Sequence, residues 1–273
     1  MIDTCRTKYP LLLIHGVGHR DSERFRYWGR IPETLETNGA TIYYGQQDGW
    51  ASIEYNAGML KDRLSQILME TNCKKVNIIA HSKGGLDARC MISTMGMANR
   101  VASLTTIGSP HHGCKTMTPL LRLPTAAFRA TARVVNLIFW LLGDTEPNFF
   151  YTCRQFSTAY MQAFNKRTPD AADVYYQSYA AVMKNSFSDW LLLWPNVFVS
   201  LVEGENDGLV TPKSAAWANF RGVLRSQASR GISHADLIDL RHRTVAISSD
   251  NGEFSDIREF YVDLVAELKA MGF

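Results

Sequence analysis

The sequence predicts an α/β fold in which a mostly parallel sheet is covered by helices on both faces. Residues 10–14 and 76–80 are short apolar runs of the length expected for buried strands. Between them, Leu60, Leu64 and Leu68 recur at the spacing of one helix face. Apolar strands that alternate with amphipathic helices are typical of a parallel sheet that is buried on both sides.

Composition indicates a single domain that spans residues 1–273. With 46% apolar residues, a chain of 273 residues can bury one substantial core. Neither repeats nor low-complexity linkers divide the chain, and we expect a monomer. The net charge of +3 is modest and no basic run is present, which excludes nucleic acid as a partner.

Cysteine usage gives no sign of a metal centre. Five cysteines cannot all pair within one chain, and none forms a CxxC motif or a metal-ligand spacing. No signal peptide is visible ahead of the first predicted strand, which leaves the compartment undecided between export and an intracellular location. The cysteines are Cys5, Cys73, Cys90, Cys114 and Cys153.

A serine lies in a turn between the strand at residues 76–80 and the helix that follows. Small residues stand two positions before and two positions after Ser82, at Ala80 and Gly84. This spacing lets the backbone turn sharply and expose a nucleophilic hydroxyl, and the usual pattern is G-x-S-x-G. Ala80 replaces the first glycine, and a serine beside glycine also caps ordinary helices, so the motif alone is ambiguous.

Partners for this serine occur further along the chain. A serine hydroxyl needs a histidine as general base and an acid that orients the histidine. Residues 198–210 read as a buried strand that runs into an acidic turn at Asp207, and His234 stands in a loop before the final helix. The order Ser, Asp, His is that of α/β-hydrolases. Two acids and one base are rival candidates: Glu203, Glu205 and His242.

A third catalytic element is expected after the first strand, where residues 15–19 read His-Gly-Val-Gly-His. Acyl transfer creates a negative oxygen that two preorganised backbone N–H groups can stabilise. We expect the N–H groups of Val17 and Lys83, the residue after the serine, to form this oxyanion hole. Alternatively, Gly16 and Gly18 only make a tight connection between a strand and a helix.

Together these residues resemble the bacterial true lipases of the Pseudomonas and Burkholderia type, which are family I triacylglycerol lipases of the α/β-hydrolase superfamily. The matching pieces follow the family's order and cover most of residues 7–117 and much of residues 173–240. The resemblance implies an α/β-hydrolase fold with an inserted lid. The matching pieces are residues 7–10, 15–16, 27–28, 31–35, 38–43, 75–79, 82, 106–113, 206–210 and 234–236.

The chain departs from the family pattern at two places. Lys83 stands where those lipases often have histidine or glutamine, and we expect its side chain to point outward from the start of the helix. Residues 119–172 depart most, and the resemblance implies that residues 118–172 form an inserted lid or cap.

The divergent segment predicts an amphipathic helix at residues 123–142. Two arginines disfavour membrane insertion, so we expect no transmembrane segment. Residues 156–164 predict a second cap helix, with Tyr160 and Phe164 on one face, although core helices of an ordinary domain would show the same patterns. The apolar side of the first helix contains Phe128, Val135, Phe139 and Leu142, and the polar side contains Arg129, Arg133 and Asn136.

The resemblance also implies a structural calcium ion that ties the histidine loop to a neighbouring loop. Asp189 and Asp236 fall at the positions of the two aspartate ligands, and Asp239 could substitute for either. Oxygen ligands of this kind suit Ca²⁺. Alternatively, Asp236 and Asp189 cap a turn and a helix, as many aspartates do.

The function that follows is a serine esterase, a lipase that cleaves acylglycerol esters at an oil or membrane interface. Ser82 is the expected nucleophile, His234 the base and Asp207 the orienting acid. A phospholipase or another lipid-ester hydrolase is the alternative among enzymes, because the triad does not select the leaving group. A catalytically silent protein that binds lipid or a partner is the alternative of another class, although binding alone does not require all three residues.

Overall fold

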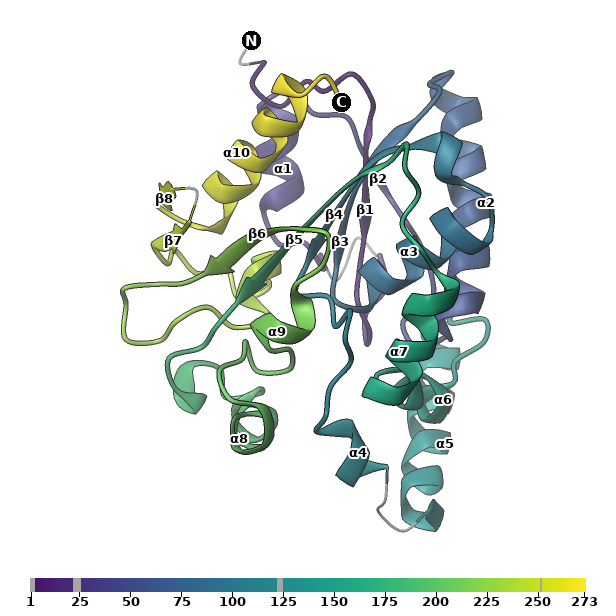
Figure 1. Ribbon diagram of the computed structural model, residues 1–273, viewed down its shortest axis with the longest axis vertical. Helices are drawn as coiled ribbons and strands as arrows, with labels where there is room; N and C mark the ends of the chain where they lie inside the picture. The colour runs from purple at the N-terminus through teal and green to yellow at the C-terminus, as the bar shows by residue number, and fades with distance from the viewer. Residues whose placement is uncertain (1–2, 22–25, 122–124, 251) are drawn as a thin grey trace.

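A computed structural model describes residues 3–21, 26–121, 125–250 and 252–273. Its main feature is a six-stranded sheet in the order β2-β1-β3-β4-β5-β6 (Figure 1). All five pairings are parallel, which confirms the predicted fold class. The strands are β1 (Leu11–Ile14), β2 (Ile42–Tyr44), β3 (Val76–His81), β4 (Val101–Ile107), β5 (Tyr175–Ala181) and β6 (Asn219–Leu224).

The strand order places a topological switch point between β1 and β3. The chain runs from β1 outward to β2 and then returns to pair β3 on the other side of β1. In open parallel sheets the loops at such a point diverge and leave a crevice beyond the carboxyl ends of the strands. The loops that follow β1 and β3 contain Gly16 and Ser82, so the two predicted catalytic turns meet there.

Helices cover both faces of the sheet (Figure 1). On one face, α1 (Ile31–Thr37) and α10 (Ile257–Ala270) enclose one apolar cluster. On the other face, α2 (Ile53–Thr71), α3 (Lys83–Thr94) and α7 (Thr158–Arg167) enclose a second cluster. Phe164 of α7 is fully buried in that cluster, so α7 is a helix of the main core.

The inserted segment contains α4 (Met117–Leu120), α5 (Thr125–Leu141) and α6 (Phe149–Gln155) ahead of α7. Residue 123, the predicted start of the amphipathic helix, lies outside the described residues. Asn136 is on the inward side of α5, because its side-chain oxygen accepts a hydrogen bond from the Phe149 N–H. Leu142, predicted on the apolar side, is exposed. Within the described residues, no helix is long and apolar enough to cross a membrane.

The strand predicted at residues 198–210 is wrong. Its first part belongs to helix α8 (Leu193–Glu203). This helix has Pro195 in its first turn and ends before Gly204, where φ is +93°. Most of its apolar side chains face solvent, so the continuous apolar run does not mark a buried strand. The remaining elements are 3₁₀ helices η1 (Ala98–Arg100), η2 (Ser186–Ser188) and η3 (Asp236–Ile238), helix α9 (Pro212–Ala215) and an antiparallel pair, β7 (Ile247–Ser249) and β8 (Gly252–Phe254).

Candidate active site

Ser82 occupies a strained turn between β3 and α3. Its φ of +55° and ψ of −130° lie in a region that residues with a side chain rarely adopt. Holding a serine there costs about 1–3 kcal/mol, and such strain concentrates at functional sites. The Ser82 N–H donates to the carbonyl of Ile107 at 3.0 Å, which ties the turn to the end of β4.

The glycines after Ser82 are required by the close approach of α3 to the sheet. A Cβ on Gly84 would lie 2.4 Å from the His15 carbonyl oxygen, and one on Gly85 would lie 2.2 Å from Ser109 Oγ. Ala80 is buried in β3, in register with Ile14, and accommodates its methyl group there. The departure from the usual glycine therefore leaves the turn intact.

Asp207 and His234 form a buried pair. His234 Nδ1 lies 2.7 Å from Asp207 Oδ2, and the His234 N–H donates to the Asp207 carbonyl at 2.7 Å. The other carboxylate oxygen accepts the N–H groups of Leu209 and Val210 at 3.0 and 2.8 Å. Because Nδ1 donates its proton to the carboxylate, Nε2 is available to accept one from a serine hydroxyl.

The rival residues are engaged elsewhere. Glu203 accepts hydrogen bonds from the N–H and hydroxyl of Thr116, and Glu205 forms an exposed ion pair with Arg225. His242 is exposed. The sequence order therefore selected the acid and the histidine that the structure brings together.

The Asp207–His234 pair lies beside the serine turn. The ring of His81, the residue before Ser82, has its centroid 4.3 Å from that of His234. A Cβ on Gly108 would lie 3.3 Å from both His234 Cε1 and Asp207 Oδ2. Gly108 directly follows Ile107, the acceptor of the Ser82 N–H. The ends of β3 and β4 thus bring the serine, the histidine and the aspartate into one site.

The loop after β1 lies directly against Ser82. A Cβ on Gly16 would lie 2.7 Å from Ser82 Cβ and 3.2 Å from its Oγ, so only glycine allows this approach. The Gly18 N–H donates to the Gly49 carbonyl at 3.1 Å and fixes the far end of the loop. Lys83 contributes the first N–H of α3, which has no acceptor within the helix. Val17 lies between the two glycines, in the position expected for the second donor.

Tyr27 connects this loop to His81. Its hydroxyl accepts the Gly16 N–H at 2.8 Å and lies 2.6 Å from His81 Nδ1. The Tyr27 hydroxyl is therefore within hydrogen-bond distance of both the loop and the residue before Ser82. Burial, together with the neighbouring His234 and His19, lowers the pKa of His81 well below its ordinary value. A neutral His81 puts no positive charge beside the His234 ring.

Replacing Tyr27 with phenylalanine is expected to weaken both the fold and the site. The buried Gly16 N–H would lose its acceptor, which costs about 1–3 kcal/mol of unfolding free energy. Urea unfolding and kcat on a p-nitrophenyl ester measure the two effects. Tyr151→Phe is the matched control, because Tyr151 is exposed on α6. Equal stability and kcat in the two variants would contradict this role of the Tyr27 hydroxyl.

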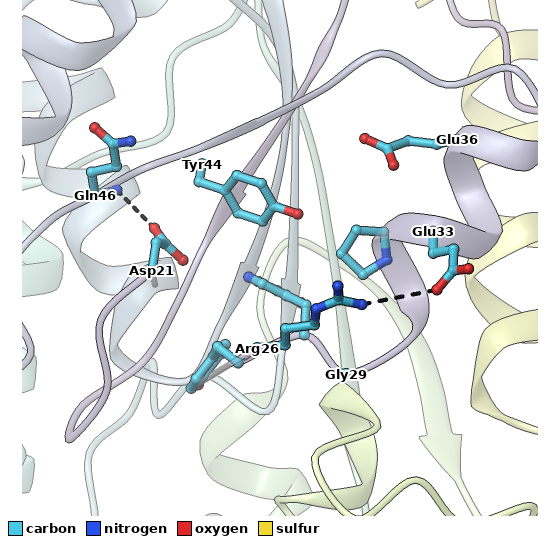
Figure 2. Close-up of a pocket in the computed structure, with 10 residues that line it drawn as sticks. Asp21, Arg26, Gly29, Glu33, Glu36, Tyr44 and Gln46 are labelled. Atoms are coloured by element: carbon cyan, nitrogen blue, oxygen red, sulfur yellow. Dashed lines mark hydrogen bonds and ion pairs between the residues drawn. The ribbon is translucent and has the colours of Figure 1, made fainter. Parts of the chain in front are cut away.

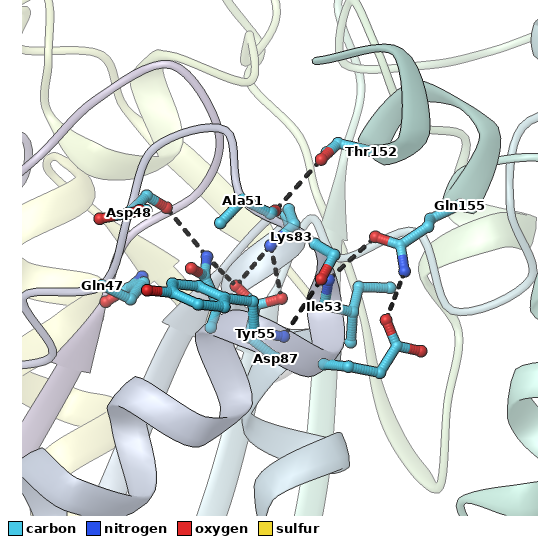
Figure 3. Close-up of polar contacts among 12 residues, drawn as sticks. Gln47, Asp48, Ala51, Ile53, Tyr55, Lys83, Asp87, Thr152 and Gln155 are labelled. Carbon is cyan, nitrogen blue, oxygen red and sulfur yellow. Dashed lines mark hydrogen bonds and ion pairs between the residues drawn. The ribbon is translucent and has the colours of Figure 1, made fainter. Parts of the chain in front are cut away.

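The Lys83 side chain does not point outward as expected. It is buried, and its Nζ donates to both carboxylate oxygens of Asp87 at 2.7 and 2.9 Å (Figure 3). Asn56 Nδ2 donates to the same carboxylate at 3.0 Å. Burial raises the pKa of Asp87, against the opposing effect of Lys83 and Asn56. The signal available in the sequence was the four-residue spacing of lysine and aspartate on one helix.

Two buried aspartates that the sequence did not indicate anchor the inserted segment. Asp144 accepts the N–H groups of Gly49 and Trp50 at 3.0 and 2.9 Å. Asp48 Oδ2 accepts the N–H groups of Thr145 and Glu146 at 2.6 and 2.8 Å. On α6, Thr152 and Gln155 bond the backbone of Ala51 and Ile53 (Figure 3). Asn56 also donates to the Asp48 carbonyl at 2.9 Å, which links this anchor to Asp87 and the serine helix.

Asp189 and Asp236 do lie together, on either side of Ser233. However, both oxygens of Asp189 accept hydrogen bonds from Arg241, at 2.8 and 3.0 Å. Arg243 Nη1 lies 3.7 Å from Asp236 Oδ1. Asp239 is held by Arg30 through two contacts of 2.7 Å. The described residues contain no group of three or more His, Cys, Asp or Glu that could hold a metal ion. These residues do not fit a calcium ion.

A separate cavity of about 880 Å³ lies beside α1 and β2 (Figure 2). Its lining includes charged side chains such as Asp21, Arg26 and Glu33, and it also reaches Tyr27. Ser82 and His234 do not line it. The five cysteines are all free thiols.

Comparison with known proteins places the chain in a family. The family model for palmitoyl protein thioesterase matches residues 10–241. The chain belongs to the palmitoyl protein thioesterase family. Triacylglycerol lipase 2 of Saccharomyces cerevisiae is 29% identical over 265 residues, which cover 90% of this chain and 74% of that protein. The triacylglycerol lipase of Burkholderia plantarii is 30% identical over 178 residues.

The second relative confirms the resemblance to bacterial lipases. The match covers 60% of this chain and only about half, 49%, of the Burkholderia protein. Among solved structures, a Staphylococcus hyicus lipase superposes over 98% of each chain with a TM-score of 0.71 at 14% identity. This structural similarity confirms the α/β-hydrolase fold of this member of the thioesterase family.

Proposed function

We propose that the protein is a serine hydrolase that cleaves acylglycerol esters through an acyl-enzyme. The observation that carries this proposal is the buried Asp207–His234 pair, with a 2.7 Å contact, beside the strained Ser82 turn. Ser82 Oγ attacks the ester carbonyl carbon while His234 Nε2 takes the hydroxyl proton. The proton then passes to the departing alkoxide, and a water molecule activated by the same nitrogen releases the fatty acid.

The negative oxygen of each tetrahedral intermediate would be held by the N–H groups of Val17 and Lys83. Donors of this kind contribute about 3–4 kcal/mol each to stabilisation of the transition state. Gly16 supports this role, because its lack of a side chain lets the loop approach Ser82. Asp207 keeps the His234 ring in the required orientation and stabilises the imidazolium.

A lipid substrate is supported by two exposed apolar helices at one end of the molecule. Figure 1 shows α5 and α8 on the lower side, where the inserted segment lies. Soluble proteins rarely expose large apolar patches, which mark binding surfaces for membranes, ligands or other proteins. The exposed side chains are Val134, Leu137, Ile138, Trp140, Leu141 and Leu142 in and after α5, and Trp190, Leu191, Trp194, Phe198, Leu201 and Val202 in and before α8.

We propose that helix α5 acts as a lid. Phe139 of α5 packs edge-on against Trp50, with ring centroids 6.2 Å apart. Trp50 in turn lies beside the loop after β1, because a Cβ on Gly18 would be 3.8 Å from its Nε1. Ser82 and His234 are only 6% and 7% exposed, so a bulky ester needs an opening movement. We propose that a lipid surface binds the apolar face of α5 and opens the site.

Substitutions on the exposed face test this proposal. Trp140→Ser and Trp194→Ser are expected to lower hydrolysis of an emulsified long-chain triacylglycerol severalfold, because the enzyme adsorbs less to the surface. Hydrolysis of soluble p-nitrophenyl butyrate is expected to remain unchanged. Met69→Ser is the matched control, since Met69 is 76% exposed on α2. Equal losses on both substrates, or no loss on either, would refute an interfacial role.

The family assignment favours a second candidate, hydrolysis of palmitoyl thioesters. The same serine, histidine and oxyanion donors can cleave oxygen esters and thioesters, since both pass through a tetrahedral oxyanion. The comparison that separates them uses tripalmitoylglycerol, a palmitoylated cysteine peptide and a dipalmitoyl phospholipid. We expect the highest kcat/KM on the glyceride. A higher value on the peptide or on the phospholipid would move the assignment to a thioesterase or a phospholipase.

A further inference from the structure

The loop that contains His234 is bracketed by two carboxylates. Ser233 Oγ donates to Asp189 Oδ2 at 3.3 Å, and the Ser233 N–H donates to Asp236 Oδ2 at 3.0 Å. Asp189 comes from the segment before α8, so this cluster connects two distant parts of the chain immediately beside His234. Whatever neutralises these carboxylates also fixes the position of the histidine.

Arginine groups surround the cluster. Arg241 forms a bidentate ion pair with Asp189, in which Nε donates to Oδ2 at 3.0 Å and Nη2 donates to Oδ1 at 2.8 Å. Asp189 itself is completely buried. Arg243 Nη1 donates to the Ser188 carbonyl at 3.2 Å and lies 3.7 Å from Asp236. Arg241 thus binds Asp189 directly, whereas Arg243 binds the neighbouring carbonyl oxygen and faces Asp236 at ion-pair distance, leaving Asp236 Oδ1 without a hydrogen bond among the described residues.

We infer that Arg241, assisted by Arg243, takes the place of a divalent cation in holding the His234 loop. A guanidinium is permanently charged, and its planar fork matches a carboxylate in two bonds. A bound cation would have to displace these bonds and collect six or more oxygen ligands. Arg241 is therefore a positioning residue, and this inference rests on the proposed role of His234 as the base.

The charge state of Asp189 agrees with this arrangement. Burial by itself raises the pKa of the carboxyl, but the hydrogen bonds and charge of Arg241 outweigh it and leave the pKa below its ordinary value. Asp189 is therefore ionised at neutral pH and binds Arg241. Because the folded-state pKa is lowered, this stabilisation is present above about pH 4 and is lost only as the pH falls through the lowered folded-state pKa.

The test compares the wild-type protein with Arg241→Ala in a chelator and in millimolar CaCl₂. For the wild type we expect the Tm and kcat to be the same in both solutions. Arg241→Ala is expected to lower the Tm by about 5–10 °C and kcat by about ten- to a hundredfold, with little change in KM. Calcium is expected to raise both values in this variant, because it can bind the buried Asp189 carboxylate that has lost its counter-charge, together with Asp236. Arg241→Lys should retain intermediate values.

Arg221→Ala is the matched control, because Arg221 binds both oxygens of Glu267 at 3.0 and 2.9 Å between β6 and α10. Calcium is expected to leave the Tm and kcat of this control unchanged. A chelator that lowers the wild-type Tm would overturn the inference, as would an Arg241→Ala variant that behaves like Arg221→Ala. If Arg241→Ala does not fold, two measurements still test the inference: the wild-type Tm in chelator and the Tm and kcat of Arg241→Lys. The Tm measurements need no substrate. If the proposed function alone were wrong, calcium would therefore still raise the Tm of Arg241→Ala.

Discussion

Replacing Ser82 with alanine is expected to lower kcat/KM for p-nitrophenyl esters by about four to six orders of magnitude. In the proposed mechanism this hydroxyl is the atom that forms the acyl-enzyme, so the substitution removes the covalent route. The folded state is expected to survive, since alanine keeps the Cβ and removes one hydroxyl. Initial rates with C4 to C16 esters measure the effect, and circular dichroism checks the fold.

The matched pair Asp207→Asn and Glu205→Gln separates the orienting acid from its exposed rival. Asp207→Asn is expected to lower kcat by about 10⁴, because an amide cannot hold the required tautomer of His234. Glu205→Gln should leave kcat unchanged, since Glu205 forms an exposed surface pair with Arg225. Labelling by a fluorophosphonate probe gives an independent readout. Activity in Ser82→Ala within tenfold of wild type would contradict Ser82 as the nucleophile, whereas a wild-type protein that the probe does not label would favour the catalytically silent alternative.

The parts of this site that the sequence could predict are those that local rules govern. The turn at Ser82 depends on neighbours within two residues, and the order of Ser82, Asp207 and His234 is readable along the chain. The strands that lead into these turns are short apolar runs, which the structure places at β1 and β3. The order along the chain was enough to select Asp207 and His234, although the element before Asp207 is helix α8 and not the predicted strand.

Helix α8 could not be predicted by the same rules. A continuous apolar run normally indicates burial, and for that reason the start of residues 198–210 predicts a buried strand. In the structure Leu201 is 78% exposed. Apolar residues that bind a lipid surface follow the same chemistry as core residues, so a single sequence cannot separate the two until the fold shows which side is covered.

The sequence does not predict the anchors of the inserted segment, because their partners are far away in the sequence. Asp48 is bonded to Thr145 and Glu146, almost one hundred positions later. An aspartate in a loop is usually solvated or caps a turn, and nothing next to Asp48 indicates otherwise. Lys83 differs, because Asp87 lies one helical turn away and could have indicated a buried pair.

The Lys83–Asp87 pair leads to the largest expected effect on stability. Asp87→Ala would leave the Lys83 ammonium buried without a counter-charge, and Lys83→Met would leave the carboxylate in the same position. Breaking a buried pair from one side costs about 3–5 kcal/mol of unfolding free energy. The pair lies in the first turns of α3, so a shift of the Lys83 N–H should also lower kcat. Urea unfolding and ester hydrolysis measure the two effects.

The double variant Lys83→Met/Asp87→Leu decides what the pair contributes. If the charges only compensate each other, apolar side chains of similar size should restore stability to within about 1 kcal/mol of wild type. Asn56 would keep its bond to the Asp48 carbonyl at 2.9 Å, so one of its hydrogen bonds survives. Arg225→Ala, which breaks an exposed pair, should cost less than about 1 kcal/mol. A double variant as unstable as either single one would mean that the carboxylate is needed for its bond to Asn56, and hence for the connection between the serine helix and the cap.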